Sequence, residues 1–249
     1  MRKKIILPVT LLLLSLGVLA CAPKQPAAPR TAEQYLREGE DFFERRLYDR
    51  AIESWQKVRD SYYSPELNVI AELKIAEAYF LAERYVEAAT AYEDFLRQHP
   101  DHARTPDVLY HLGLSYYRQM LSIDRDQTAT QNALATFELL TTKYPNDPRR
   151  EEVGFLMQRC RDHLAASELY VGRFYFRTGQ YEAAVRRLER LFVKYPNFFE
   201  RDEAYFYLGR AYLETNQREQ AVNTFNTLFR EFPQSQFVPR AQRIIARAY

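Results

Sequence analysis

The chain has 249 residues, of which 47% are hydrophobic and 27% are charged, with 35 lysines and arginines against 33 aspartates and glutamates. This balance argues against a nucleic-acid-binding protein, which needs a basic face to neutralise phosphates. Arg2, Lys3 and Lys4 stand at the start of the chain, so removal of residues 1–20 leaves 32 basic residues against 33 acidic ones. Without residues 1–20 the net charge is about −1, so the basic excess of the full chain lies in that N-terminal segment.

Residues 1–20 have the pattern of a secretion signal. The basic start is followed by an apolar run from Ile5 to Ala20, shorter than the roughly 20 apolar residues of a transmembrane helix. The tetrapeptide Val18-Leu19-Ala20-Cys21 resembles the lipobox of bacterial lipoproteins, which implies cleavage before Cys21 and acylation of that cysteine. An ordinary cleaved signal with an incidental cysteine is the alternative. Acyl chains contribute about 0.8 kcal/mol per buried methylene, so an acylated Cys21 would anchor the chain to a membrane.

The residues after Cys21 indicate in which membrane the protein is anchored and how the repeats are attached to the anchor. Ala22 stands where many inner-membrane lipoproteins carry an aspartate, so the resemblance implies the outer membrane, facing the periplasm. Pro23, Pro26 and Pro29 prevent a helix in residues 21–30 and favour an extended tether of about 3.1 Å per residue. A disordered segment is the alternative, and it would hold the repeats away from the membrane in much the same way. An acylated Cys21 leaves Cys160 without a disulfide partner, and we expect Cys160 to be buried.

A repeated helix pair of the tetratricopeptide type accounts for residues 31–249. In the clearest copy, Gly209 and Ala221 are twelve residues apart, where two antiparallel helices cross so closely that side chains must be small. The same pairing occurs five times, at Gly39/Ala51, Ala76/Ala88, Gly113/Ala133, Gly172/Ala184 and Gly209/Ala221. A large residue follows each second-helix alanine at plus four: Trp55, Tyr92, Phe137, Leu188 and Phe225. The sequence therefore predicts an all-α superhelix of five helix-turn-helix repeats with a closing helix in residues 235–249.

Prolines are expected to end the second helix of each repeat, because the residue before a proline is pushed out of the helical region. They stand twelve residues after the second-helix alanine in four repeats, at Pro100, Pro145, Pro196 and Pro233. In the first repeat we expect Pro65 to do the same, two residues later.

Two repeats are longer than the others. Repeat three contains an eight-residue insertion within the run SIDRDQTATQ, residues 122–131. Fourteen extra residues precede Gly172, and their apolar positions keep helical spacing. Repeat four is therefore predicted to open with one long helix that runs from Arg149 to Phe176, with Asp147 and Pro148 as N-cap and first-turn residues.

These irregularities carry a resemblance to a known family. The inserted run Ile123-Asp124-Arg125-Asp126-Gln127-Thr128, followed by Ala135, Phe137 and Tyr144-Pro145, resembles the BamD family of lipoproteins of the outer-membrane β-barrel assembly machinery. Asp162-His163-Leu164-Ala165 with Glu168, Tyr175 and Tyr195-Pro196 is also similar to that family. The resemblance implies a scaffold that binds the POTRA domain of a BamA-like protein nearest its barrel, other Bam lipoproteins and unfolded outer-membrane proteins. The basic closing helix departs from the family pattern.

Two other classes of function are weighed against this one. A pilotin or adaptor for a secretin or other envelope complex would share the lipobox and the repeats, but the insertion favours the barrel-assembly scaffold. An enzyme is disfavoured, because the four histidines, His99, His102, His111 and His163, have no cysteine or carboxylate partners at metal-ligand spacing. No catalytic residue, metal or cofactor is expected.

An aromatic stripe predicts a client-peptide groove. Phe43, Phe80 and Tyr117 each come four residues after the small residue of a first helix, one position beyond the aromatic residues of the helix seam. A rotation of roughly 100° per residue would turn them toward the concave surface of the superhelix. There they could bind an extended peptide with an aromatic end, with Glu40, Glu44 and Glu77 beside them; the alternative is that all are packing residues.

Basic residues concentrate near the C-terminal end. Arg186, Arg187, Arg190 and Lys194 share one predicted helix, and Arg240, Arg243 and Arg247 recur on the closing helix. Solvated faces are the alternative to an interface. The family resemblance favours Arg187, whose counterpart before Tyr195-Pro196 lies at the BamA contact in similar proteins. We therefore predict a partner interface that includes Arg187, Arg190 and Arg243.

Overall fold

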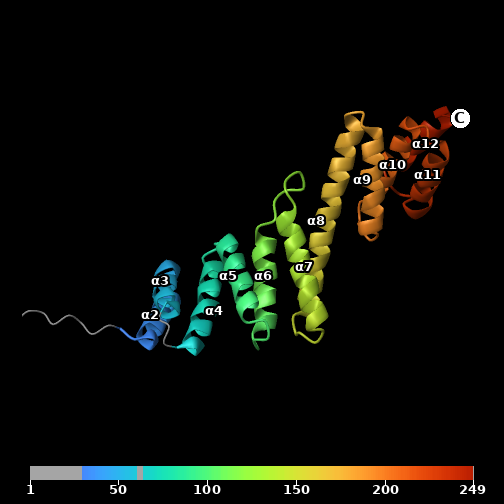
Figure 1. The fold of residues 1–249 in the computed structure, drawn as a ribbon. Helices are drawn as coiled ribbons and strands as arrows, with labels where there is room; N and C mark the ends of the chain where they lie inside the picture. Colours follow the sequence, from blue (N-terminus) through green and yellow to red (C-terminus); the bar gives the residue numbers. More distant parts are fainter. Residues whose placement is uncertain (1–29, 61–63, 249) are drawn as a thin grey trace, which may run out of the picture.

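The computed structural model describes residues 30–60 and 64–248, and all regular structure in those residues is α-helical. The helices are α2 (Ala32–Glu44), α3 (Tyr48–Arg59), α4 (Pro65–Leu81), α5 (Tyr85–Gln98), α6 (Thr105–Arg118), α7 (Thr128–Lys143), α8 (Arg150–Arg177), α9 (Tyr181–Lys194), α10 (Arg201–Glu214), α11 (Arg218–Glu231) and α12 (Val238–Ala248). Figure 1 shows them in chain order along an elongated array. The predicted all-α class is confirmed. The predicted signal peptide, Cys21 and most of the predicted tether lie outside the described residues.

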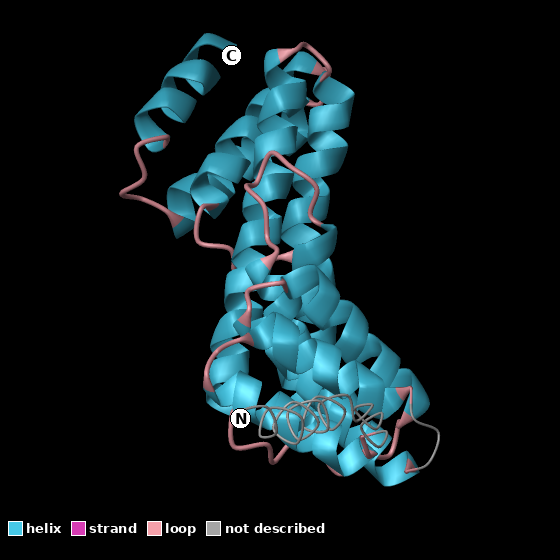
Figure 2. Ribbon diagram, turned by 90° about the vertical axis from the view of Figure 1, so that its left-hand side faces the viewer, coloured by secondary structure: helices cyan, strands magenta, loops and turns pink. Residues whose placement is uncertain are grey.

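The helices form five antiparallel pairs, as a tetratricopeptide superhelix requires. α2 packs against α3, and α4/α5, α6/α7, α8/α9 and α10/α11 form the later pairs. Each second helix also packs against the first helix of the next pair, which joins the pairs into a continuous stack. Figure 2 shows that stack from a second direction, with the C-terminal helix at the opposite end from the first pair.

The small residues of the repeat make room for one large side chain from the opposite helix. A Cβ atom on Gly39 would lie 2.3 Å from Nε1 of Trp55, and one on Gly209 would lie 2.7 Å from Cε1 of Phe225. Gly113 has the same relation to Phe137, and Gly172 to Leu188. These four large side chains are fully buried. The alanines of the predicted pairs are buried too, so the repeat register predicted from the sequence is confirmed.

Four of the repeats share one form of turn between their two helices. One residue of each turn has positive φ: Arg46 (57°), Glu83 (59°), Gly179 (76°) and Asn216 (59°). In the first repeat, Arg46 N donates to Phe43 O and Leu47 N to Phe42 O, both at 2.9 Å, which satisfies the last carbonyls of α2. Repeat three has no such turn, because its insertion occupies this position.

The loop between α6 and α7 that contains the insertion, residues 119–127, is held by its own side chains. Gln127 Nε2 donates to the carbonyl oxygens of Ser122 and Arg125, both at 3.0 Å. The carboxylate of Asp126 accepts the backbone N–H of Thr128 at 2.9 Å, and this bond lowers the pKa of Asp126. The RDQT signature therefore encodes the internal hydrogen bonds of a defined loop.

α8 confirms the predicted long helix, with 28 residues. Two boundary predictions are wrong. Pro65 does not end the second helix of repeat one, since α3 ends at Arg59 and Pro65 occupies the first turn of α4, where its missing N–H costs no hydrogen bond. Asp147 and Pro148 are not the N-cap and first-turn residues of α8, because the N-cap is Arg149 and both residues precede it. Asp147 instead accepts the backbone N–H of Arg149 at 2.9 Å and pairs with its guanidinium.

The closing helix is confirmed as α12. Phe237, just before it, stacks on Phe206 of α10 with ring centroids 5.0 Å apart, and Ala241 is fully buried. Val238, Ile244 and Ile245 pack on the same core cluster. α12 therefore covers the apolar end of the last repeat.

Candidate functional site

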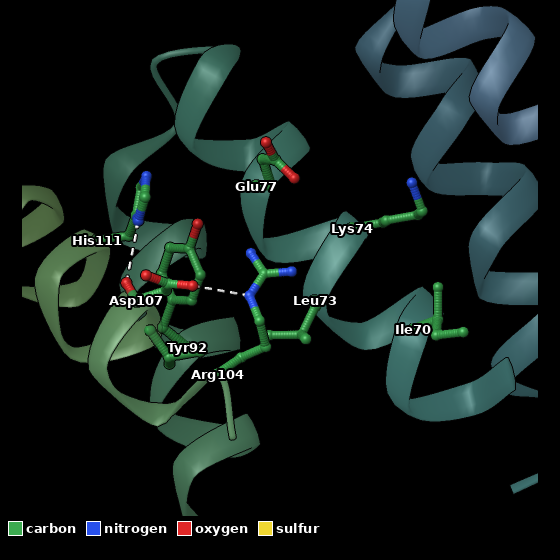
Figure 3. Close-up of a pocket in the computed structure, with 9 residues that line it drawn as sticks. Ile70, Leu73, Lys74, Glu77, Tyr92, Arg104, Asp107 and His111 are labelled. Atoms are coloured by element: carbon green, nitrogen blue, oxygen red, sulfur yellow. Dashed lines mark hydrogen bonds and ion pairs between the residues drawn. The ribbon is translucent and has the colours of Figure 1, made fainter. Parts of the chain in front are cut away.

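A pocket of about 150 Å³ lies between α4 and α6, the first helices of repeats two and three. Its lining residues are Ile70, Leu73, Lys74, Glu77, Tyr92, Arg104, Asp107, Val108 and His111. We call it the α4–α6 pocket, and Figure 3 shows α4 side chains on one side of it and α6 side chains on the other. Four of the lining residues are spaced at three and four residue intervals, from Ile70 to Glu77, which places them on one face of α4.

The polar wall of the pocket is fixed by Asp107. Its Oδ2 pairs with Arg104 Nε at 2.8 Å and its Oδ1 with Arg149 at 2.9 Å, so both carboxylate oxygens are engaged (Figure 3 draws the first contact). His111 Nδ1 lies 3.0 Å from the backbone oxygen of Asp107. Because a carbonyl can only accept, Nδ1 carries the proton in this contact. The other ring nitrogen of His111 has no partner among the described residues and is available to a ligand.

Tyr92 gives the pocket a second polar group. Its side chain is only 4% exposed, and its hydroxyl makes no hydrogen bond to another described residue. Burial is the main cause that raises the pKa of Tyr92, so the phenol stays protonated and can donate or accept. Glu77 is exposed at the rim, and Lys74 Nζ lies 3.2 Å from Glu40 of α2. The pocket therefore combines apolar walls with a few polar groups, as peptide-binding sites do.

The predicted stripe is distributed over three repeats, and its members are half-buried. The ring of Phe43 packs on Tyr48 and Trp55 at centroid distances of 5.6 and 5.5 Å. Phe80 packs on Tyr85 and on His111, the second at 5.4 Å, so it borders the α4–α6 pocket. Tyr117 belongs to the next core cluster along the stack. No aromatic contact joins two of the three among the described residues.

Of the α4 lining residues, Glu77 was named beside the groove in the sequence analysis, but Ile70, Leu73 and Lys74 were missed, although a signal existed. Ile70, Leu73, Lys74 and Glu77 follow the spacing of a helix face, and Ile70 is an apolar residue that is 41% exposed. The groove prediction instead followed the position four residues after each small residue. The side chain at that position packs on the second helix of its own repeat and on the first helix of the next, as the contacts of Phe80 with Tyr85 and His111 show.

Arg187, the first predicted interface residue, is engaged inside its own repeat. Its Nε lies 2.6 Å from Glu168 Oε2 of α8, and both side chains are mostly buried. The two charges touch without the alignment of a hydrogen bond. Burial, and next the Glu168 carboxylate, raise the pKa of the neighbouring Tyr195. Arg187 therefore helps to hold α9 against α8.

Arg190 and Arg243 are more accessible. Arg190 is exposed on α9 and makes no ion pair within the described chain. Arg243 is exposed on α12, where its Nε donates to the carbonyl of Pro239 at 3.2 Å. Arg187 and Arg190 are neighbours three residues apart on α9, whereas Arg243 lies on α12 in a separate part of the chain.

Neither a metal-binding cluster nor a membrane-spanning helix occurs in residues 30–60 and 64–248. No group of three or more histidines, cysteines, aspartates and glutamates within the described chain is placed to hold a metal ion. Among the described helices, none combines the length and apolar character needed to cross a membrane. Cys160 is buried, as expected, and burial raises the pKa of its thiol to about 12.

Comparison with known proteins identifies the family. Residues 29–218 match the family model YfiO, described as outer membrane lipoprotein, and residues 203–235 match a tetratricopeptide repeat model. The chain belongs to the BamD (YfiO) family of outer membrane lipoproteins. It is 30% identical over 169 residues to the outer membrane protein assembly factor BamD of Rickettsia prowazekii, a match that spans 68% of this chain and 67% of the relative. It is 27% identical over 212 residues to the protein of that name from Neisseria meningitidis serogroup A, with 78% of each chain covered.

The BamD family match ends within α11. α12, with Arg240, Arg243 and Arg247, lies beyond residue 218. The basic closing helix, which departs from the family pattern, is thus outside the matched region. A solved structure titled TPR2AB-domain:pHSP90-complex of yeast Sti1 is also similar, at a TM-score of 0.45 and 16% identity, with 87% of this chain and 86% of that chain covered.

Proposed function

We propose that this protein is an outer-membrane lipoprotein scaffold of the β-barrel assembly machinery. The observation that carries the proposal is the match of residues 29–218 to the family, together with relatives named outer membrane protein assembly factor BamD. In this proposal an acylated Cys21 anchors the chain in the outer membrane, facing the periplasm. Its partners are a BamA-like barrel protein with POTRA domains, other Bam lipoproteins and unfolded outer-membrane proteins.

The α4–α6 pocket is the site that we assign to unfolded clients. Ile70 and Leu73 offer apolar surface, while the Tyr92 hydroxyl and the free nitrogen of His111 can bond peptide groups. Phe80 supports the pocket through its contact with His111. Phe43 and Tyr117, at the equivalent positions of repeats one and three, would extend the groove to either side.

A single charge placed on the apolar wall tests this assignment. Ile70→Asp should weaken binding of a fluorescent peptide from an unfolded outer-membrane protein by about tenfold, because the carboxylate disrupts the apolar wall. Val86→Asp is the matched control: Val86 is 62% exposed on α5 and does not line the pocket. The client binds elsewhere if both substitutions lower the affinity equally or if neither does.

In this proposal, the C-terminal repeats bind a POTRA domain of the barrel protein. Arg190 and Arg243 present exposed guanidinium groups that form no ion pair with other described residues, and such groups suit carboxylates of a POTRA domain. Because the Arg187 guanidinium already pairs with Glu168, only its remaining N–H groups can bind such a domain.

The membrane address and the partner can be tested in one fractionation. The parent protein, purified from detergent-solubilised envelopes, should bring a BamA-like barrel protein with it. Cys21→Ser should leave the repeats folded but release the chain to the soluble periplasmic fraction when that partner is depleted, since acyl chains supply the anchor. Retention of the variant in the outer membrane would contradict the lipid anchor, and absence of the barrel protein would contradict the scaffold.

A further inference from the structure

A basic pocket lies at the C-terminal end of the stack, between α10 and α12. It has a volume of about 280 Å³ and is lined by Arg210 of α10 and by Arg240, Arg243 and Arg247 of α12. The rings of Phe206 and Tyr207 form its apolar part. No acidic residue lines it, although residues 21–249 contain 33 acidic and 32 basic residues. We call it the arginine pocket.

The charges of the arginine pocket are uncompensated. None of its four arginines forms an ion pair in residues 30–60 and 64–248, whereas Arg149, Arg173 and Arg187 each pair with a carboxylate within 3 Å. Arg210 instead lies over the ring of Phe176, with Cζ 4.4 Å from the centroid, and 5.6 Å from that of Phe206. Repulsion between like charges at close range is relieved when an anion binds.

The pocket is held in shape before any ligand binds. Phe206, only 4% exposed, stacks on Phe237 at the start of α12, and Ala241 is fully buried beneath that helix. Arg240, Arg243 and Arg247 recur at intervals of three and four residues, so they project from one face of α12. A ligand therefore meets guanidinium groups that are already gathered, which lowers the entropic cost of binding.

We propose that the arginine pocket binds an extended acidic segment of a protein partner. Guanidinium groups bind carboxylates through two parallel hydrogen bonds, and four of them can receive more than one acidic side chain. The half-buried side chains of Tyr207 and Ile244 suit apolar residues between those acids. A hollow between two helices fits a peptide better than it fits the flat surface of a membrane. This inference deepens the interface assigned above to Arg243, but it does not require that the segment belong to a POTRA domain.

A pair of synthetic peptides tests the proposal on the full-length lipoprotein in detergent. A fluorescent peptide of alternating Glu and Phe should bind, and the same peptide with Gln in place of Glu should not. Arg210→Gln with Arg240→Gln should reduce the affinity for the acidic peptide by at least about tenfold, and higher salt should weaken binding by the parent. Arg45→Gln with Arg118→Gln removes the same charge at exposed positions outside the pocket and should change the affinity less than about twofold.

Further variants separate binding from folding. Circular dichroism should remain helical in both double variants, and Arg247→Gln, near the exposed end of α12, should weaken binding even if Arg210→Gln disturbs packing on Phe176. Equal binding of the Glu and Gln peptides, or equal loss in the two double variants, would overturn the proposal. It is also overturned if the parent ignores the acidic peptide but binds phosphatidylglycerol vesicles in a manner that depends on Arg210 and Arg240. Each of these results is independent of whether a POTRA domain binds.

Discussion

At each close approach between paired helices, a glycine or alanine leaves the volume into which one large side chain of the opposite helix fits. Gly209 and Phe225 are one such pair, and the missing Cβ would lie 2.7 Å from a ring carbon that is fully buried. We expect Gly209→Ala to lower the free energy of unfolding by about 1–3 kcal/mol, because neither the ring nor the backbone can move away cheaply. Denaturant unfolding followed by circular dichroism measures this.

Gly154 provides the matched control for that substitution. It lies inside α8, and a Cβ there would meet nothing within 4 Å. Gly154→Ala should therefore raise the free energy of unfolding by up to about 1 kcal/mol, the difference in helix propensity between the two residues. If both substitutions stabilise the protein, the contact between Gly209 and Phe225 is not tight.

Among the elements, α8 and the loop that carries the insertion of repeat three are in contact. The sequence predicted them as two separate irregularities, yet His163 Nε2 of α8 lies 2.8 Å from the carbonyl oxygen of Leu121 in the insertion. The extra length of α8 supplies the surface against which the inserted loop rests. The insertion in repeat three and the long first helix of repeat four therefore occur together.

Gln127 is the residue on which the shape of the insertion depends most. Gln127→Ala removes the two hydrogen bonds to the carbonyls of Ser122 and Arg125, each worth about 0.5–1.5 kcal/mol. We expect faster amide hydrogen exchange in residues 119–127 and little change in the helices far from them. Gln131→Ala, an exposed position on α7, should leave exchange in the loop unchanged. Equal protection of the loop in the parent and Gln127→Ala would mean that other contacts hold it.

The positions of the elements could be predicted because the repeat is local. Gly172 and Ala184 face each other across one turn, and their spacing is visible in the sequence. Pro65 was misassigned because a proline suits the first turn of a helix as well as the position after one. Asp147 was misassigned because its side chain bonds Arg149 in a turn before the helix.

The candidate sites were less predictable, because they depend on how neighbouring helices are rotated. The face of α4 that carries Ile70 becomes a wall only when α6 lies opposite it. Arg210 lines the same pocket as the arginines of α12, although it lies far from them in the sequence. No short sequence motif could therefore reveal the cluster. The pairing of Arg187 with Glu168 likewise requires the rotation of α9 against α8.

Over the whole molecule, the elongated stack separates the candidate sites. The α4–α6 pocket belongs to repeats two and three, Arg187 and Arg190 to repeat four, and the arginine pocket to the last repeat and α12. In Figure 1 these elements lie in order along the array, so partners bound at the two ends need not overlap. A scaffold that brings a client and a barrel protein together requires such separation.

The ion pair between Arg187 and Glu168 complicates a test of the partner interface by charge reversal. Arg187→Glu would place two carboxylates at a contact that is now 2.6 Å long and mostly buried. Breaking such a pair by removal of one partner costs about 3–5 kcal/mol, so the single variant should lose stability even without a partner. Loss of POTRA binding by Arg187→Glu would therefore not assign Arg187 to the interface.

Exchange of the two charges resolves the question. Glu168→Arg with Arg187→Glu keeps an ion pair between α8 and α9, so thermal unfolding of the double variant should recover most of the stability lost by Arg187→Glu. If Arg187 also meets a carboxylate of the partner, the exchange presents the wrong charge there, and a purified POTRA domain should bind about tenfold or more weakly. Arg190 is exposed and forms no ion pair with other described residues, so Arg190→Glu should weaken the same binding with no loss of stability. Binding of the POTRA domain to the exchanged variant as tightly as to the parent would confine Arg187 to packing α9 on α8, and the interface would then have to be sought at Arg190 and Arg243.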